Sequence, residues 1–367
     1  MSISFFETVI SPQAIQLATE VLRSGWVSEG FRVAEFEDGL SRHHQLSHPV
    51  AVNSGTSALH LALVLAGVKA GDEVILPPQT FVATAHAVLM QQATPVFADI
   101  DPTTGNLSAA SLERALSDRT KAVIAVHWGG YPCDLAALGG LAARHKVVLI
   151  EDAAHALGAA YLGRAIGSVS RFTCFSFQAI KHVTCGDGGA LCCTDPGDAA
   201  EARRRRWFGI ERGQAGPFEL GEREGDIESA GFKYHMNDLA AAVGLGNLAG
   251  FRERLARRRE IAAVYRQDFE GVPGLTLLRS DTGYHSAHWL FTVLVERRAS
   301  FVRALEERGV PTSVVHRRID RHPVFGRTRP DLAGQDDFDE RQISIPLHSS
   351  LSDREVQQIV EGVRAGW

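Results

Sequence analysis

Seven short hydrophobic runs recur along the first half of the chain, rich in β-branched residues and apolar on both faces. Runs of this kind are typical of strands buried in a mostly parallel sheet. Helical patterns separate several of them, so the alternation predicts the α/β class, with helices on both faces of a central sheet. The predicted strands are residues 50–53, 73–78, 94–100, 121–128, 146–153, 171–177 and 189–193, and the clearest helical stretches are 57–68, 108–118 and 134–146.

The pattern changes after about residue 240. Residues 240–269 form one long helical pattern that three glycines weaken or kink, Gly244, Gly246 and Gly250. Two strand-like stretches follow, then a helix and a final helix that starts from Ser352. We therefore expect a large domain at 1–245 and a smaller C-terminal α+β domain at 246–367. The strand-like stretches are 276–280 and 288–296, and the first of the two helices is 298–309.

Composition excludes several classes of protein. With 45% apolar and 22% charged residues among 367, the chain is globular, and a net charge of −5 argues against a nucleic-acid binder. The arginine run 203–206 is expected to be a solvated helix face. The odd count of five cysteines, without metal-type pairing, fits buried thiols in a reducing compartment and predicts no metal site. No signal peptide or membrane span is expected, which favours a cytoplasmic protein.

The first candidate site follows the first predicted strand, in the segment NSGTSALHLAL at residues 53–63. Gly55 lets the backbone approach a ligand closely, and Thr56 and Ser57 place hydroxyls beside the free N–H groups of a helix that begins near Ser57. Such a helix start favours an anion by about 0.3–2 kcal/mol, and phosphate is the usual guest. The same residues also suit an ordinary helix N-cap.

The second candidate site is the segment VVLIEDAAHALGA at residues 147–159. Asp152 follows an apolar strand, where a carboxylate is costly unless a cation or several donors face it. A protonated pyridine nitrogen would be such a partner, and His155 could contact a ring oxygen or cover a ring face. In the alternative interpretation Asp152 caps a following helix, and His155 is a hydrogen-bonded core histidine.

The third candidate site is the segment FSFQAIKHVTCGDGG at residues 175–189. Lys181 lies between an aromatic apolar run and a glycine-rich turn. A lysine that is held at the end of a packed sheet and is partly desolvated can lose its proton and act as a nucleophile. Ser176 could add a phosphate contact. A loop lysine that merely follows a strand is the alternative.

The three segments are expected at the carboxyl ends of the strands, where open α/β sheets bind their ligands. Together they supply an anion cradle, a buried carboxylate and a poised amine. Pyridoxal 5′-phosphate (PLP) has a phosphate, a basic pyridine nitrogen and an aldehyde that forms a Schiff base with lysine. The three features match the three ends of this one molecule, so the sequence predicts PLP as the cofactor.

The chain resembles the DegT/DnrJ/EryC1/StrS group of fold-type I aminotransferases, which act on nucleotide-linked keto-sugars. The resemblance covers nearly the whole chain, and EDAAHALGA and the lysine segment are its most specific parts. It implies the fold-type I architecture and an active site built from two chains, so at least a homodimer. The segments that carry it are 24–38, 53–63, 76–88, 99–108, 151–159, 175–189, 231–245 and 345–356.

The resemblance also implies catalytic roles. Lys181 would form the Schiff base with the cofactor and move the proton in the reaction. Asp152 would pair with the pyridine nitrogen, and His155, where relatives often have Gln, would lie near the ring oxygen. Phe81 would stack on the ring.

Thr56, Ser57 and Ser176 would hold the phosphate, with Gly55 in the same turn. In relatives the segment that matches GFKYHMND reaches the neighbouring subunit's site, often with Asn on the phosphate. This chain has Lys233 there, which suggests a cation–phosphate contact in place of a neutral hydrogen bond.

One departure from the family pattern leaves the sugar's identity open. Relatives often show a His-x-x-Pro pattern near the sugar site, whereas this chain reads SVVHRRIDRHPVF at 313–325. Arg317, Arg318 and Arg321 could meet a diphosphate or a carboxylate there, or form a solvated basic loop.

The resemblance therefore implies an aminotransferase that moves an amine from an amino acid to a nucleotide-activated deoxy keto-sugar. Glutamate is the expected amino-acid donor. A cyclitol ketone or a keto-sugar without a nucleotide are alternative acceptors. A sugar dehydratase is a second alternative, although such family members carry His where Lys181 stands. A non-catalytic protein of the same fold is the third. No nucleic acid or membrane partner is expected.

Overall fold

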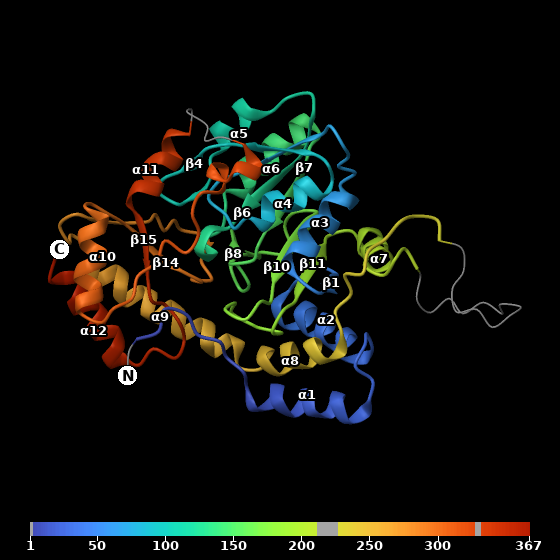
Figure 1. Ribbon diagram of the computed structural model, residues 1–367, viewed down its shortest axis with the longest axis horizontal. Coiled ribbons are helices and arrows are strands. Elements are labelled where there is room, and N and C mark those ends of the chain that lie inside the picture. The colour runs from blue at the N-terminus through green and yellow to red at the C-terminus, as the bar shows by residue number, and fades with distance from the viewer. Residues whose placement is uncertain (1–2, 211–226, 327–331) are drawn as a thin grey trace, which may run out of the picture.

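The computed structural model describes residues 3–210, 227–326 and 332–367. At its centre is a seven-stranded sheet in the order β1-β11-β10-β7-β6-β2-β3 (Figure 1). The strands from β10 to β3 run parallel, and β11 pairs antiparallel with both β10 and β1. The sequence prediction of a mostly parallel sheet is thus confirmed. The strands are β1 (Pro49–Val52), β2 (Glu73–Leu76), β3 (Thr94–Phe97), β6 (Thr120–Val126), β7 (Val148–Asp152), β10 (Phe172–Ser176) and β11 (Gly189–Cys193).

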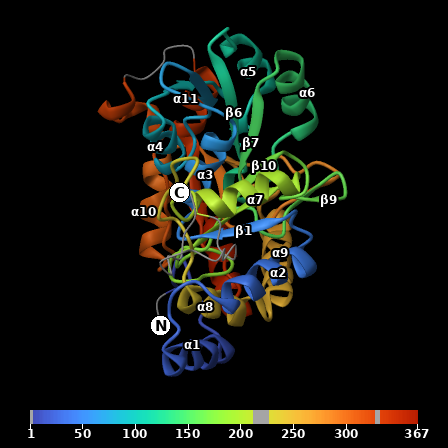
Figure 2. The ribbon, with the colours of Figure 1, turned by 90° about the vertical axis from the view of Figure 1, so that its right-hand side faces the viewer.

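Helices cover both faces of this sheet (Figures 1 and 2), as the alternating pattern predicts. Successive strand residues point to opposite faces, so neighbours such as Val50 and Ala51 belong to different core clusters. One face packs against α3 (Gly55–Leu65), α4 (Ala83–Met90) and α7 (Pro196–Arg205). The other packs against α2 (Phe31–His44), α5 (Ala109–Ala115) and α6 (Leu135–His145).

The C-terminal third builds a second core around a three-stranded sheet, β12 (Leu275–Leu277), β14 (Phe291–Val295) and β15 (Gln342–Ile345). Helices α10 (Arg298–Glu307) and α12 (Asp353–Arg364) cover it, and Ser352 begins α12 with a capping box. The remaining elements are α1 (Pro12–Ser24), α8 (Asp238–Leu248), α9 (Phe251–Phe269), α11 (Ala333–Arg341), β4 (Ile100–Asp101), β5 (Asn106–Leu107), β8 (Ala160–Tyr161), β9 (Arg164–Ala165) and β13 (Tyr284–His285).

The long helical pattern at 240–269 is two helices, α8 and α9. The break falls at Gly250, whose φ of 72° is left-handed and therefore open chiefly to glycine. Phe251 and Leu255 at the start of α9 pack into the core of the large sheet, whereas Ile261 and later residues pack into the second core. We propose the domain division at 245/246, which lies one turn before this break.

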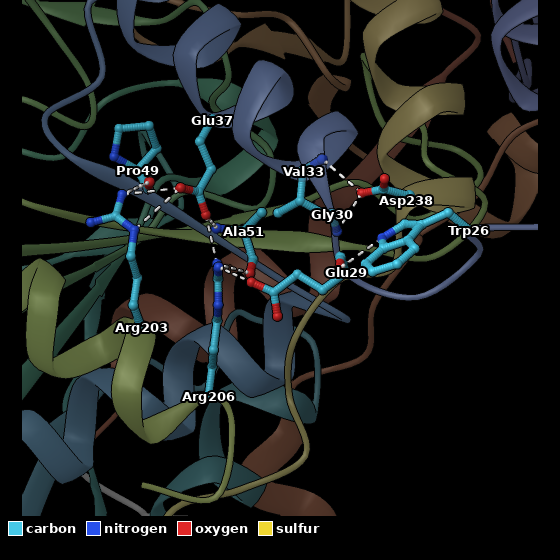
Figure 3. Close-up of polar contacts among 10 residues, drawn as sticks. All are labelled: Trp26, Glu29, Gly30, Val33, Glu37, Pro49, Ala51, Arg203, Arg206 and Asp238. Atoms are coloured by element: carbon cyan, nitrogen blue, oxygen red, sulfur yellow. Dashed lines mark hydrogen bonds and ion pairs between the residues drawn. The ribbon is translucent and has the colours of Figure 1, made fainter. Parts of the chain in front are cut away.

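The expectation of a solvated arginine face at 203–206 is wrong for Arg206. Only 5% of this residue is exposed, and its guanidinium forms 2.6 Å ion pairs with both Glu29 and Glu37 (Figure 3). It also donates to the carbonyl of Ala51 in β1 at 2.8 Å. Arg203 meets the second oxygen of Glu37 at 3.0 Å. This network ties α7 to α2 and to the edge strand β1.

Replacing Arg206 with Ala should lower the free energy of unfolding by about 3–5 kcal/mol, because Glu29 loses the buried guanidinium and Glu37 keeps only its contact with Arg203. Urea denaturation measures this loss. Arg42→Ala is the matched control, since its ion pair with Asp38 is exposed and contributes about 0–1 kcal/mol. Equal losses in the two variants would contradict a supporting role for the buried network.

All five cysteines are free and buried, as predicted. Among the described residues every helix is too short or too polar to span a bilayer. Within the same ranges, His, Cys, Asp and Glu side chains form no group that could hold a metal ion.

Candidate functional site

A cavity of about 420 Å³ lies where the parallel strands β6, β7 and β10 end. It brings together residues from all three segments that the sequence singles out. Trp289 and His316, from the C-terminal part of the chain, complete its wall. The predicted site residues that line the cavity are Gly55, Thr56, Phe81, Asp152, His155, Ser176 and Lys181.

The start of helix α3 forms one end of the cavity. Ser54 is the N-cap, and its side chain accepts from the Ser57 amide at 3.1 Å. Ser57 lies behind the lining, where its hydroxyl donates to Asn53 at 2.6 Å. A side chain at Gly55 would meet Ser176 at 3.0 Å, so glycine lets the helix start approach β10 closely. Ser54, Thr56 and Ser176 therefore bring hydroxyl groups to the end of the cavity where α3 begins, and a helix N-terminus with hydroxyls beside it suits a phosphate.

Asp152 ends β7 with its carboxylate enclosed, and 6% of the residue is exposed. Thr84 donates to one carboxylate oxygen at 2.8 Å, and the Ala154 amide donates to the other at 3.2 Å. Burial raises the pKa of Asp152, although these two bonds and the charge of Lys181 oppose the rise. Turns and not a helix follow Asp152, so it does not act as a helix cap. A cationic guest would relieve the burial of this carboxylate.

Lys181 projects into the same cavity from the loop after β10. Burial lowers the pKa of its amine from 10.5 to about 7, although the charge of Asp152 acts in the opposite direction. An amine with such a pKa is partly unprotonated at neutral pH and can therefore act as a nucleophile and as a base. This setting differs from that of a solvated loop lysine.

His155 and Phe81 lie on the walls between these groups. Only 4% of His155 is exposed, and its Nδ1 atom is buried without a hydrogen-bond partner among the described residues. It is therefore not the fully bonded core histidine of the alternative interpretation. Burial and nearby cations lower its pKa, so the imidazole is neutral. Phe81 is 53% exposed at the mouth, with its ring 5.1 Å from that of His316.

Sequence reasoning misses Thr84, Trp289 and His316, along with other residues of the lining such as Ser54 and Gln178. Thr84 lies only three residues after Phe81, in the same segment 76–88, and both residues line the cavity. His316 stands in the 313–325 segment, which the sequence singles out only for its arginines. Trp289 falls in the strand-like stretch 288–296, and its sequence context carries no signal for a site.

Lys233 and the three arginines lie apart from this lining. Lys233 is exposed, with its amine 5.8 Å from the ring of Trp207. Arg318 is buried between Asp320 and Asp336, and Arg321 pairs with Asp339. Arg317 is exposed beside His316 and has no ion pair within the described residues. Two of the three arginines are thus already neutralised within the chain.

The cavity fits PLP by its donor chemistry. A helix N-terminus with hydroxyls suits the phosphate, an enclosed carboxylate suits a protonated ring nitrogen, and an amine of lowered pKa suits the aldehyde. The unpartnered Nδ1 of His155 leaves a polar group for a ring oxygen. All four features line one cavity of small-molecule size.

Comparisons with known proteins agree with this chemistry. The profile of the DegT/DnrJ/EryC1/StrS aminotransferase family matches residues 9–364. The spore coat polysaccharide biosynthesis protein SpsC of Bacillus subtilis is 38% identical, over 97% of this chain and 95% of its own length. The structure of the sugar aminotransferase CalS13 from Micromonospora echinospora superposes with a TM-score of 0.95 at 33% identity, over all of both chains.

Spr1654 from Streptococcus pneumoniae has been solved in a PLP-form and a PMP-form. Its PLP-form superposes with a TM-score of 0.91 at 29% identity, over 100% of this chain and 98% of the other.

Proposed function

The chain belongs to the DegT/DnrJ/EryC1/StrS aminotransferase family, and we propose that it transfers the amino group of glutamate to the ketone of a nucleotide-activated deoxy sugar. It is a PLP-dependent aminotransferase of the sugar aminotransferase family, with the fold-type I architecture. The observation that carries the proposal is the convergence of Lys181 and Asp152 on one cavity.

The cofactor would be held at three points. Its phosphate would lie at the start of α3, against Thr56, Ser176 and the amide groups near Gly55, and Ser57 would brace this turn from behind. Phe81 would cover the ring at the cavity mouth, and His155 would offer Nδ1 to the ring oxygen. These contacts fix the ring before substrate arrives, which lowers the entropic cost of the reaction.

When bound, PLP supplies an electron sink that stabilises negative charge at the substrate carbon. Asp152 keeps a proton on the pyridine nitrogen, because its carboxylate is enclosed and favours a cation opposite it. Thr84 and the Ala154 amide hold that carboxylate in place. Lys181 takes a proton from the carbon of the amine donor, and in the second half of the reaction it returns a proton to the carbon of the acceptor. Its pKa of about 7 suits both directions at neutral pH.

We assign the anionic end of a substrate to Arg317. It is the one arginine of the three without an ion pair in the described part of the chain, and it adjoins His316 in the cavity wall. A guanidinium in this place suits a diphosphate or a carboxylate. This supports a nucleotide-linked acceptor or an amino-acid donor and does not separate them.

The test of the function uses purified protein supplied with PLP. Glutamate should bleach the long-wavelength visible absorption, and a keto-sugar nucleotide should restore it while mass spectrometry finds the amino sugar. A product that has lost water without gaining nitrogen would identify a dehydratase instead. A nucleotide thermal-shift screen distinguishes nucleotide-linked sugars from free sugars or cyclitols.

A homodimer completes the site in this proposal. Large apolar side chains are exposed near the start of α2, among them Trp26, Val27 and Phe31, as expected for an interface. Asp238 holds this turn by accepting from the Gly30 and Val33 amides at 2.8 and 3.0 Å (Figure 3). Light scattering that finds an active monomer would refute this part of the proposal.

Lys233→Ala should weaken PLP binding about tenfold, because a charge-assisted hydrogen bond contributes about 1.5–3 kcal/mol and part of that is lost to solvent. Lys233 would supply this contact to the phosphate of the partner subunit's site. Titration of cofactor-free protein with PLP measures the affinity. Lys69→Ala, which removes another exposed lysine, is the control. Unchanged affinity in Lys233→Ala would exclude the contact.

A further inference from the structure

Trp289 lies where the C-terminal part of the chain meets the lysine loop. Only 1% of it is exposed, although its ring lines the cavity. Its indole N–H donates to the carbonyl of Ile180 at 3.0 Å, the residue before Lys181. Its backbone amide donates to Gly129 at 2.9 Å. Trp289 is thus held by its backbone amide, and its indole N–H holds the backbone next to Lys181.

The ring of Trp289 also carries two groups of the site. The amine of Lys181 lies 3.6 Å from the ring centroid, well within the range of a cation–π interaction. The imidazole of His155 stacks on the indole with the ring centroids 3.7 Å apart and the planes 18° apart. One side chain therefore fixes the position of Lys181 and the plane of His155.

The amine of Lys181 has few other partners for its charge. Among the described residues no carboxylate lies within ion-pair distance of it, and Asp152 acts on it only over a longer range. The histidines around it are His155, His182 and His316, whose pKa values are all lowered by burial and by nearby cations. Asp187 lines the same cavity, and Glu7, Arg254 and Arg258 line a small pocket on the other side of Lys181. The negative face of the indole is thus the close contact that favours the ammonium form.

We propose that Trp289 is a positioning residue of the amino transfer: its ring holds the free amine of Lys181 as an ammonium at the cavity wall, and its N–H fixes the lysine loop. The proposal rests on the proposed function in that Lys181 is taken as the reacting amine. Holding the proton on Nζ keeps it available for return to the substrate carbon. Stacking on the indole keeps the imidazole plane of His155 fixed in the cavity wall.

The test measures the pKa of Lys181 in the full chain freed of cofactor. Competitive acetylation with acetic anhydride across a pH series, followed by mass spectrometry of the Lys181 peptide, gives this pKa without using PLP. In Trp289→Leu the pKa should fall by about one unit, because burial then acts without the ring. In Trp289→Phe, which keeps an aromatic face, it should fall less than half as far.

Trp128→Leu is the matched control. Trp128 is buried to the same 1% in the same aromatic cluster, but it meets His155 edge-on at 5.9 Å. The Lys181 pKa in this variant should stay within about 0.3 units of the wild-type value, because a cation–π contact needs the cation within about 6 Å of a ring face. An equal fall in Trp128→Leu and Trp289→Leu would show a general loss of packing and would overturn the proposal.

Fluorinated tryptophan provides a second test that does not depend on Trp289→Leu folding. Fluorine withdraws electron density from the face of the indole ring and changes its shape little. When all five tryptophans are replaced by fluorinated analogues, the Lys181 pKa should therefore fall further with each fluorine per ring. In the Trp289→Phe background the same labelling should have no effect. A Lys181 pKa that does not change with fluorination of the wild-type chain would refute the cation–π contact.

Different results would refute the proposed function and the proposed role of Trp289. A chain that neither binds PLP nor transaminates, yet shows the Trp289-dependent pKa, would refute the proposed function alone. An active transaminase whose Lys181 pKa is the same with and without the indole would refute the role of Trp289 alone.

Discussion

Lys181→Ala should abolish the visible absorption of the PLP-loaded protein and lower the rate of amine transfer by about 10²–10⁴-fold or more. The variant lacks both the nucleophile and the group that carries the proton, and a positioned acid–base group alone accounts for about 10²–10⁴-fold. PLP should still bind, because the phosphate cradle at the start of α3 is intact. Absorption spectra and steady-state rates with glutamate measure both effects.

Lys69→Ala is the control for Lys181→Ala, since it removes an exposed lysine far from the cavity. It should keep both the absorption and the rate. Added small primary amines should restore part of the rate in Lys181→Ala, since they can enter the space that the side chain leaves. A Lys181→Ala variant that transaminates at the wild-type rate would contradict the assignment.

Asp152→Asn should lower the rate about 10²–10³-fold while the visible absorption remains, because Lys181 is still present. The enclosed carboxylate is the group that would stabilise a proton on the pyridine nitrogen, and removing one such electrostatic contact from a water-poor site costs about 10²–10³-fold. The amide keeps the shape of the carboxylate and can still accept from Thr84. The loss should therefore come from charge and not from folding.

Two comparisons separate these causes. Asp118→Asn, which neutralises an exposed carboxylate, should leave the rate unchanged. The thermal unfolding of Asp152→Asn should match or exceed that of the wild type, since an amide is cheaper to bury than a carboxylate. A rate within about twofold of the wild type would exclude Asp152 as the partner of the ring nitrogen.

Much of the central sheet could be predicted from the sequence, because strands buried on both faces have an unmistakable composition. The runs that became β7 and β10 are rich in apolar residues, and their ends place Asp152 and Ser176 beside the same cavity. Three segments distant in sequence could be joined because each carries a different part of one chemistry. Their individual roles stay predictions.

The missed features depend on partners far along the chain. Arg206 is buried because Glu29 and Glu37 reach it from 177 and 169 residues earlier, which no local pattern reveals. The break between α8 and α9 depends on the left-handed backbone at Gly250, whereas Gly244 and Gly246 remain helical. Trp289 acquires its contacts only when the C-terminal part of the chain packs on the lysine loop.

The most direct test of the account is to reduce the PLP-loaded protein with borohydride and map its peptides by mass spectrometry. The chain has five lysines, Lys69, Lys121, Lys146, Lys181 and Lys233. The account predicts that the phosphopyridoxyl group is found on Lys181, at one group per chain, and that Lys181→Ala carries none. Its presence on any other lysine, or its absence from the wild-type chain, would contradict the account.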